Sequence, residues 1–213
     1  MRLLLAALPL LAASPLAAQD LTLSEANLLP RIIDSLCLDL VDTSTGCEQV
    51  VLLSNPDAPD TADLIILTDR RTDTGGQPLL IRRSAFFNGA MWGMSPSLEA
   101  TDDGALFINS EQIGIGRSPW MQTITLVWDA PGFVMTAFDY ATYDRALGGS
   151  FDCAVDFRAG TAVAAIMDSE SNPLEDFAAT IPATPPAIAE ISAFEALPEF
   201  CETAIQRYYE ITN

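Results

Sequence analysis

The sequence predicts an α+β protein that is mainly β, with an antiparallel sheet curled into a sandwich or partial barrel and flanked by N-terminal and C-terminal helices. Three observations lead to this fold class. Short runs of β-branched and aromatic residues recur through the middle of the chain, separated by glycine, proline, asparagine and aspartate. Apolar residues repeat with a helical period near both ends. Residues 124–138 alternate clearly enough to fix the register of one hairpin.

The first eighteen residues are typical of a secretory signal peptide. Met1-Arg2 precedes the apolar run 3–11, and small residues follow up to Ala17-Ala18. The apolar run is shorter than the roughly 20 residues that a membrane span needs. We therefore predict a signal peptide at 1–18 and a single β-rich domain at 19–213, periplasmic or secreted, with no membrane span.

The elements of that domain are expected in the following order. Pro30 opens an amphipathic helix whose apolar face carries Ile32, Ile33, Leu36, Cys37 and Leu40. Strands are expected at 49–54, 62–68, 78–86, 96–100, 104–109, 120–129, 132–140, 151–157 and 161–167. The hairpin joins 124–128 to 133–138 through the turn 129–132. The proline-rich, acidic stretch 168–186 is a surface connection, and helices begin at Thr184-Pro185 and at Pro198.

The composition limits the possible chemistry. The chain has 29 acidic and 10 basic residues, every basic residue is an arginine, and loss of Arg2 with the signal peptide changes the formal charge from −19 to −20. Such a field repels nucleic acid and anionic membranes, so we predict no nucleic-acid partner and favour a cationic protein partner. Histidine is absent, which excludes Ser-His-Asp and Cys-His catalysis and most zinc chemistry.

The four cysteines are an even number in a chain expected to be exported, so disulfides are the first interpretation. Three pairings are possible, and we favour Cys37 with Cys47 and Cys153 with Cys201. The first pair closes a short loop before the first strand, and the second ties the C-terminal helix to the sheet. A metal site and free thiols are the alternatives, although the chain has neither histidine nor a Cys-x-x-Cys spacing.

The segment from Asn55 to Leu64 offers oxygen ligands just before a strand. It resembles the calcium loops of FG-GAP repeats, D-x-[DN]-x-D-G-x-x-D-L, with Asn55, Asp57 and Asp63 in the first, third and ninth positions. Pro59 replaces the fifth-position aspartate, and Asp60 replaces the glycine. The resemblance implies a calcium site at Asn55, Asp57, Asp60 and Asp63, while no other cofactor is expected. The alternative is a solvated turn of ordinary turn-forming residues.

Two further segments are candidates for binding. Arg70, Arg71, Arg82 and Arg83 lie on one predicted hairpin and are suited to carboxylate or phosphate groups. Neighbouring acids that neutralise them on the protein itself are the alternative. The loop 86–96 carries Met91, Trp92 and Met94, which mark a contact surface if exposed. The alternative places Trp92 in the core.

Catalytic residues are not identified. Acid pairs such as Asp102-Asp103, Asp139 with Asp144, and Asp152 with Asp156 are possible carboxylates of a glycosidase, but chance pairs are expected in so acidic a chain. Residues 114–117 lack the third glycine and the following helix that a phosphate-binding loop requires.

Three segments together resemble an uncharacterised family of secreted, β-rich proteobacterial domains. They are Gly114-Ile115-Gly116-Arg117-Ser118-Pro119-Trp120, Tyr140-Ala141-Thr142-Tyr143-Asp144-Arg145 and Cys153-Ala154-Val155-Asp156-Phe157-Arg158-Ala159-Gly160. The last reads N-[FLY]-x-[ST]-G in that family, from which Asp156 and Ala159 depart. The resemblance spans about residues 47–166 and implies a β-rich fold without an activity.

The sequence therefore favours a non-enzymatic, exported binding or interaction protein, with a cationic protein as partner. An envelope hydrolase that uses two carboxylates, and a structural module stabilised by calcium, are the alternatives.

Overall fold

The computed structural model describes residues 23–41, 46–72, 75–101, 103–188 and 196–212. Its elements, in chain order, are α1 (Leu23–Leu28), η1 (Leu29–Arg31), β1 (Ile32–Leu38), β2 (Glu48–Ser54), β3 (Thr61–Leu67), β4 (Pro78–Phe87), η2 (Ala90–Trp92), β5 (Ser97–Ala100), β6 (Leu106–Gln112), β7 (Trp120–Asp129), β8 (Gly132–Tyr143), β9 (Ser150–Asp156), β10 (Thr161–Met167), β11 (Pro173–Thr180) and α2 (Glu199–Thr212). The predicted fold class, α+β and mainly β, is confirmed.

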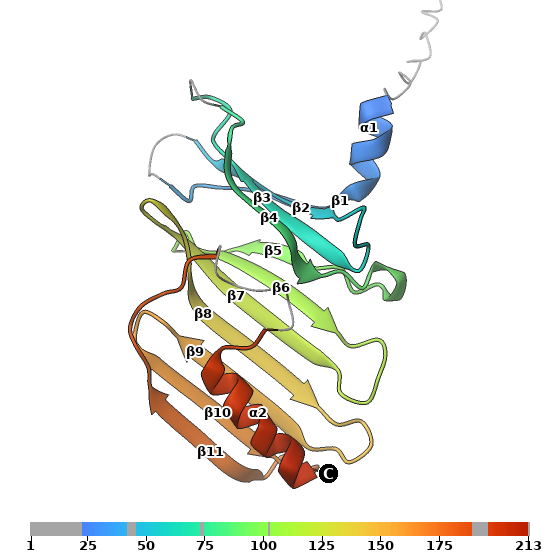
Figure 1. Ribbon diagram of the computed structural model, residues 1–213, viewed down its shortest axis with the longest axis vertical. Coiled ribbons are helices and arrows are strands. Elements are labelled where there is room, and N and C mark those ends of the chain that lie inside the picture. Colours follow the sequence, from blue (N-terminus) through green and yellow to red (C-terminus); the bar gives the residue numbers. More distant parts are fainter. Residues whose placement is uncertain (1–22, 42–45, 73–74, 102, 189–195, 213) are drawn as a thin grey trace, which may run out of the picture.

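The described strands form two antiparallel sheets in which sequence neighbours pair. One sheet has the order β1-β2-β3-β4, and the other has the order β11-β10-β9-β8-β7-β6-β5. Strand β1 contacts β5, where the backbone amide of Leu98 donates to the Asp34 carboxylate at 2.8 Å. No closed barrel forms among the described strands. The two sheets therefore meet at the β5 edge of the larger sheet (Figure 1).

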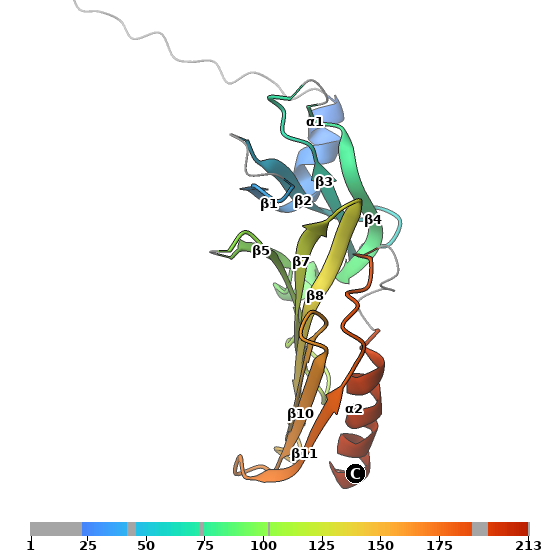
Figure 2. The ribbon, with the colours of Figure 1, turned by 90° about the vertical axis from the view of Figure 1, so that its left-hand side faces the viewer.

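One face of the seven-stranded sheet carries the core. Alternate residues of its strands, such as Leu106, Ile108 and Leu126, are fully buried and share one cluster with Leu52 and Leu64 of the smaller sheet. Helix α2 covers the same face over β9 and β10. Figure 2 shows this sheet from its edge, with α2 along one face and no described element along the other face of the lower strands. The layer is therefore covered on one side only.

Both predicted disulfide pairings are confirmed. Cys37 is bonded to Cys47 and Cys153 to Cys201, with Cα–Cα distances of 5.4 and 5.8 Å. The second bond joins β9 to α2, and its cysteines are buried. The helix is thus fixed to the sheet by a covalent bond and by an apolar stripe that includes Tyr208, whose hydroxyl donates to the Gly149 carbonyl at 3.0 Å.

Nine of the eleven described strands lie where the sequence predicts them, and β7 and β10 have the predicted bounds. The helix predicted from Pro30 is wrong, because Ile32–Leu38 is strand β1, which pairs with β2 along its length. Two consecutive β-branched residues favour the extended chain, and pairing with β2 overrides the apolar spacing. The helix of the N-terminal side, α1, ends before Pro30 and has no buried residue.

The C-terminal part differs from the prediction in two places. The supposed connection 168–186 contains β11, which pairs with β10 as an edge strand. Its first residue is Pro173, and a sheet accepts proline at that position because no ladder hydrogen bond is lost. No helix begins at Thr184-Pro185 in the described part, where Ala187 bridges to Val134 and Ile188 is buried. The predicted helix at Pro198 is confirmed as α2.

The remaining predictions about the organisation of the chain concern its N-terminus, membrane and cysteines. The predicted signal peptide at 1–18 lies outside the described residues. None of the described helices has the length and apolarity that crossing a membrane requires. All four cysteines are in disulfides, which is compatible with an extracytoplasmic location.

Candidate functional site

The uncovered face of the seven-stranded sheet is the candidate site, and we call it the open face. Successive side chains of a strand point to opposite sides of the sheet, so the residues between the buried ones face outward here. The strand registers assign seven acidic residues to this face: Glu99, Glu111, Asp129, Asp139, Asp152, Asp156 and Asp176. Strands β5 to β11 contain no arginine, lysine or histidine. The open face is therefore acidic without a basic side chain from its own strands.

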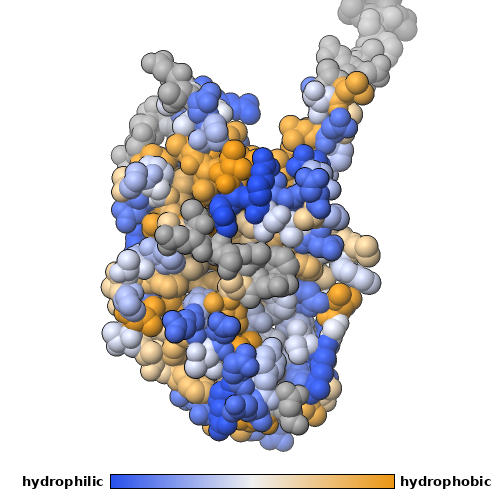
Figure 3. Space-filling view, in the orientation of Figure 1, coloured by the Kyte–Doolittle hydropathy of each residue, from blue (hydrophilic) through white to orange (hydrophobic). Residues whose placement is uncertain are grey.

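The face of the sheet that α2 covers is different. Figure 3 shows the face that carries α2, on which hydrophilic and hydrophobic residues are mixed. Glu175, on the edge strand β11, faces the side of the sheet that α2 covers, and it pairs with Arg207 of α2 at 2.9 Å. Arg207 also pairs with Glu210 at 3.0 Å. Glu175 thus has an arginine partner, whereas no ion pair is found for the open-face acids among the described residues.

A shallow groove crosses the open face from β7 to β11. Its volume is about 630 Å³, and no basic residue lines it. We call it the open-face groove. The residues that line it are Met121, Gln122, Thr123, Asp139, Tyr140, Ala141, Asp152, Cys153, Ala154, Val163, Ala164, Ala165, Asp176, Phe177 and Ala178. Five of these residues are alanines, so a ligand can approach the sheet closely.

Two rows of side chains form the floor of the groove. In the first row, Asp139 faces Ala154 on the next strand, and Ala154 faces Val163. In the second row, Asp152 faces Ala165, and Ala165 faces Asp176. The groove thus places three carboxylates around an alanine-rich floor, with Val163 52% exposed at its centre.

The electrostatic environment of the groove disfavours unpaired negative charge. Partial burial raises the pKa of Asp139 above its ordinary value of 3.8, and it does the same for Asp152. No ion pair involving the groove's aspartates is found among the described residues. A cation placed between them would restore the stabilisation that water gives to exposed carboxylates.

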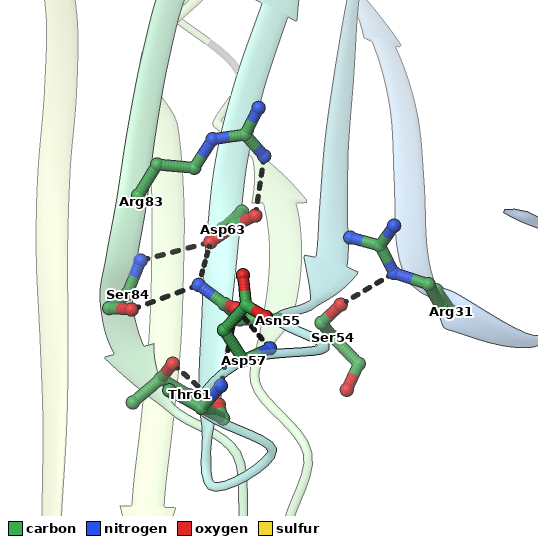
Figure 4. Close-up of polar contacts among 9 residues, drawn as sticks. Arg31, Ser54, Asn55, Asp57, Thr61, Asp63, Arg83 and Ser84 are labelled. Atoms are coloured by element: carbon green, nitrogen blue, oxygen red, sulfur yellow. Dashed lines mark hydrogen bonds and ion pairs between the residues drawn. The ribbon is translucent and has the colours of Figure 1, made fainter.

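The residues of the predicted calcium site occupy a different place, on the smaller sheet. Figure 4 shows the buried carboxylate of Asp63 accepting hydrogen bonds from the Asn55 side-chain amide at 3.0 Å and from the Ser84 backbone amide at 2.9 Å. Its second oxygen pairs with Arg83 at 2.6 Å. The Asn55 side-chain oxygen accepts from the Asp57 backbone amide at 2.9 Å.

The carboxylates of Asp57 and Asp60 stay apart from that network. Both residues are exposed, and within the described residues no group of three or more cysteine, histidine, aspartate or glutamate side chains is placed to hold a metal ion. The Asn55 and Asp63 oxygens are hydrogen-bonded to protein donors, so this geometry stabilises the β3–β4 bulge. Calcium binding is an untested prediction from the sequence, and the hydrogen bonds of this network argue against it.

The four candidate arginines do not form a single cationic surface. Arg71 pairs with Asp69 at 3.3 Å, and Arg83 pairs with the buried Asp63. Arg82 and Arg83 are consecutive on β4 and therefore point to opposite faces of the sheet. Arg70 lies in the exposed β3–β4 connection. This arrangement favours neutralisation on the protein itself.

The loop with Met91 and Trp92 exposes both side chains, 84% and 54% respectively, while Met94 is buried. The Met94 sulfur accepts hydrogen bonds from the backbone amides of Ile113 and Gly114, both at 2.9 Å. The loop is therefore anchored by Met94 against the β6–β7 connection, and Trp92 is outside the core.

Of the acid pairs proposed from the sequence, Asp139 with Asp144 and Asp152 with Asp156 have both members among the described residues, and Asp144 and Asp156 are engaged by other groups. Asp144 bonds Arg117 at 2.6 Å, which lowers the pKa of that carboxyl to about 2. Asp156 accepts from the backbone amides of Arg158 and Ala159 in the β9–β10 turn. Asp102 lies outside the described residues. The sheet instead brings together Asp139 and Asp152, on adjacent strands.

Comparisons with known proteins add no relative. No family model, curated protein or solved structure matches this chain.

Proposed function

We propose that this protein is a non-enzymatic binding domain, periplasmic or secreted, that takes a cationic ligand into the open-face groove. The observation that carries the proposal is the combination of a groove of about 630 Å³, three aspartates and no basic lining residue. Complementary charge steers association and disfavours partners of the wrong sign. Nucleic acid and anionic surfaces are therefore excluded as ligands of this face.

The cost of keeping these carboxylates supports a role in binding. The pKa of Asp139 and of Asp152 is raised because protein atoms displace water around them. Their ionisation at neutral pH therefore opposes folding. Asparagine at either position is expected to stabilise the free protein at pH 7 and to weaken ligand binding. A residue that costs stability and has no partner in the fold is typical of a functional site.

A titration with an arginine-rich peptide tests the proposal. The groove variant is D139N/D152N/D176N, and the matched control is D57N/D60N/E202Q, which removes three exposed charges outside the open face. We expect the groove variant to lose at least about tenfold in affinity, because two or three charge pairs of about 1 kcal/mol each are removed. The control is expected to stay within about twofold of the wild type. Equal weakening in both variants would mean that the total charge, and not the groove, attracts the peptide.

A carboxylate-pair hydrolase is the second candidate, and the diagonal placement of Asp139 and Asp152 favours it. Diagonal neighbours on antiparallel strands have Cβ atoms about 7 Å apart, which fits an inverting glycosidase. Two considerations place it second. Burial raises both pKa values in the same direction, whereas acid and base roles need different values. The alanine floor also offers a sugar few hydrogen-bond partners. Hydrolysis of a glycan by the wild type and loss of it in both D139N and D152N would reverse this order.

The location is tested separately. Fractionation of cells that express the full chain should recover a product shortened at the end of residues 1–18 outside the cytoplasm, with both disulfides formed. A full-length cytoplasmic product with reduced cysteines would contradict export, because that compartment keeps thiols reduced.

A further inference from the structure

We infer that the ligand of the open-face groove is a basic amphipathic α-helix of a partner protein, laid across the strands with basic residues at positions i, i+3 and i+10. This inference rests on the proposed function, and it adds the shape and the charge spacing of the ligand. The argument uses the direction of the groove, the pairing of its floor and the positions of its three aspartates.

The groove is long across the strands and short along them. Its lining residues come from five adjacent strands, β7 to β11, and each strand contributes no more than two outward-facing residues. Five strands span about 19 Å from the first to the last, and two outward positions are about 7 Å apart along a strand. A helix of about 13 residues is about 19 Å long, and its diameter with side chains is about 10 Å. A helix of this length therefore fits the groove, with the helix axis lying between the two rows of side chains.

The floor disfavours an extended peptide. Strands β7 to β10 each have a neighbour on both sides, so their backbone groups are already paired. A peptide strand lying on this floor would place its own amides and carbonyls over Ala154, Ala165 and Val163, without hydrogen-bond partners there. A helix satisfies its backbone internally and presents only side chains. The groove is therefore suited to side-chain recognition of a helix.

The spacing of the carboxylates matches one helical pattern. Asp139 is on β8, Asp152 on β9 and Asp176 on β11, with Asp152 and Asp176 in the same row. Measured across the strands from Asp139, the other two carboxylates lie about 5 Å and about 14 Å away. Helix positions i+3 and i+10 lie about 4.5 Å and about 15 Å from position i along the axis.

The angular positions agree as well. Residues i+3 and i+10 of a helix are seven apart, so they project within about 20° of each other, while residue i projects about 60–80° away. In the groove, Asp152 and Asp176 share the second row and Asp139 lies in the first. Basic side chains at i, i+3 and i+10 would therefore each reach one aspartate, with small apolar residues between them against the alanine floor.

Three soluble peptides of equal length and equal arginine count test the inference, and the first two are isomers of each other. The first is helical, with arginines at i, i+3 and i+10. The second is helical, with arginines at i, i+5 and i+9, which spread over about half of the helix circumference. The third has a proline in its centre and cannot form the helix. Circular dichroism checks the helicity, and calorimetry at low and physiological salt gives the affinity for the oxidised wild type, for D139N, D152N and D176N, and for the control E202Q on α2.

We expect the first peptide to bind at least about tenfold more tightly than the second, since two of three charge pairs are lost in the isomer. Each of the three Asp→Asn variants should reduce the affinity of the first peptide about threefold to fivefold, whereas E202Q, on α2, should leave it unchanged. Equal affinity for the first two peptides would overturn the helical spacing and leave the proposed function intact. Tighter binding of the proline peptide would mean an extended ligand. Binding of none of the three, together with none of an arginine-rich peptide, would refute the proposed function itself.

Discussion

Replacement of Cys153 and Cys201 together by alanine removes the covalent link between the sheet and α2. The two cysteines are separated by 48 residues, and Cys37 and Cys47 by 10. A disulfide stabilises a protein mainly by restricting the unfolded chain, and the effect grows with the length of the closed loop. The two disulfides should therefore differ in their contribution to stability.

The loop lengths give the expected magnitudes. The chain-entropy relation gives about 4 kcal/mol for the Cys153–Cys201 bond and about 2.7 kcal/mol for the Cys37–Cys47 bond. Cys201 is fully buried and Cys153 nearly so, so the cavity left by truncation adds to the first figure. For a domain of this size, C153A/C201A should lower Tm by roughly 8–16 °C.

Urea denaturation of the oxidised wild type, C153A/C201A and C37A/C47A provides the measurement. The free energy of unfolding should fall more in C153A/C201A than in C37A/C47A, and α2 should become susceptible to proteolysis first. A cost for C153A/C201A equal to or below that for C37A/C47A would refute the reasoning from loop length.

The remaining predictions concern the polar network of the smaller sheet, the groove and calcium. Asp63→Ala should destabilise the protein by about 3 kcal/mol in urea denaturation, because it leaves buried donors and an arginine unpaired; Glu210→Ala, which removes an exposed partner, should cost less than about 0.5 kcal/mol. Binding of a cationic peptide should weaken as the pH falls through the raised pKa values of Asp139 and Asp152, since protonation removes the charges. The free protein should gain stability over the same interval, because the folded state then binds more protons than the unfolded state. Peptide binding that is constant down to the ordinary aspartate pKa would contradict this prediction. Thermal unfolding should give the same Tm with calcium and with chelator, because protein donors already bond the Asn55 and Asp63 oxygens. A rise in Tm of several degrees with calcium would instead establish a metal site in the 55–63 loop.

The sequence predicts the interior strands well, because their residues alternate between the core and the outside and are rich in β-branched side chains. The two strands that it does not predict, β1 and β11, are edge strands of their sheets. Edge strands accept proline, acids and partly exposed apolar residues, so their composition is closer to that of helices and loops. Pairing with the adjacent strand of the chain, β2 for β1 and β10 for β11, decides their conformation.

The groove is harder to predict because it depends on the register of five strands. Asp176 lies on β11, within the segment interpreted as a connection, and Asp139 and Asp152 become neighbours only when β8 and β9 are aligned. One signal was available in the sequence: residues 97–112 and 120–143 contain several acids and no arginine. The exposure of Trp92 depends on the burial of Met94, a contact that a single sequence does not specify.

Mapping a bound cationic peptide by NMR on the isotope-labelled protein tests the central claim most directly. The proposal predicts shift changes centred on Ala154, Val163 and Ala165, which line the groove, and their loss in D139N/D152N/D176N. Shift changes confined to the Trp92 loop or to the 55–63 loop, with the groove methyls unaffected, would contradict it.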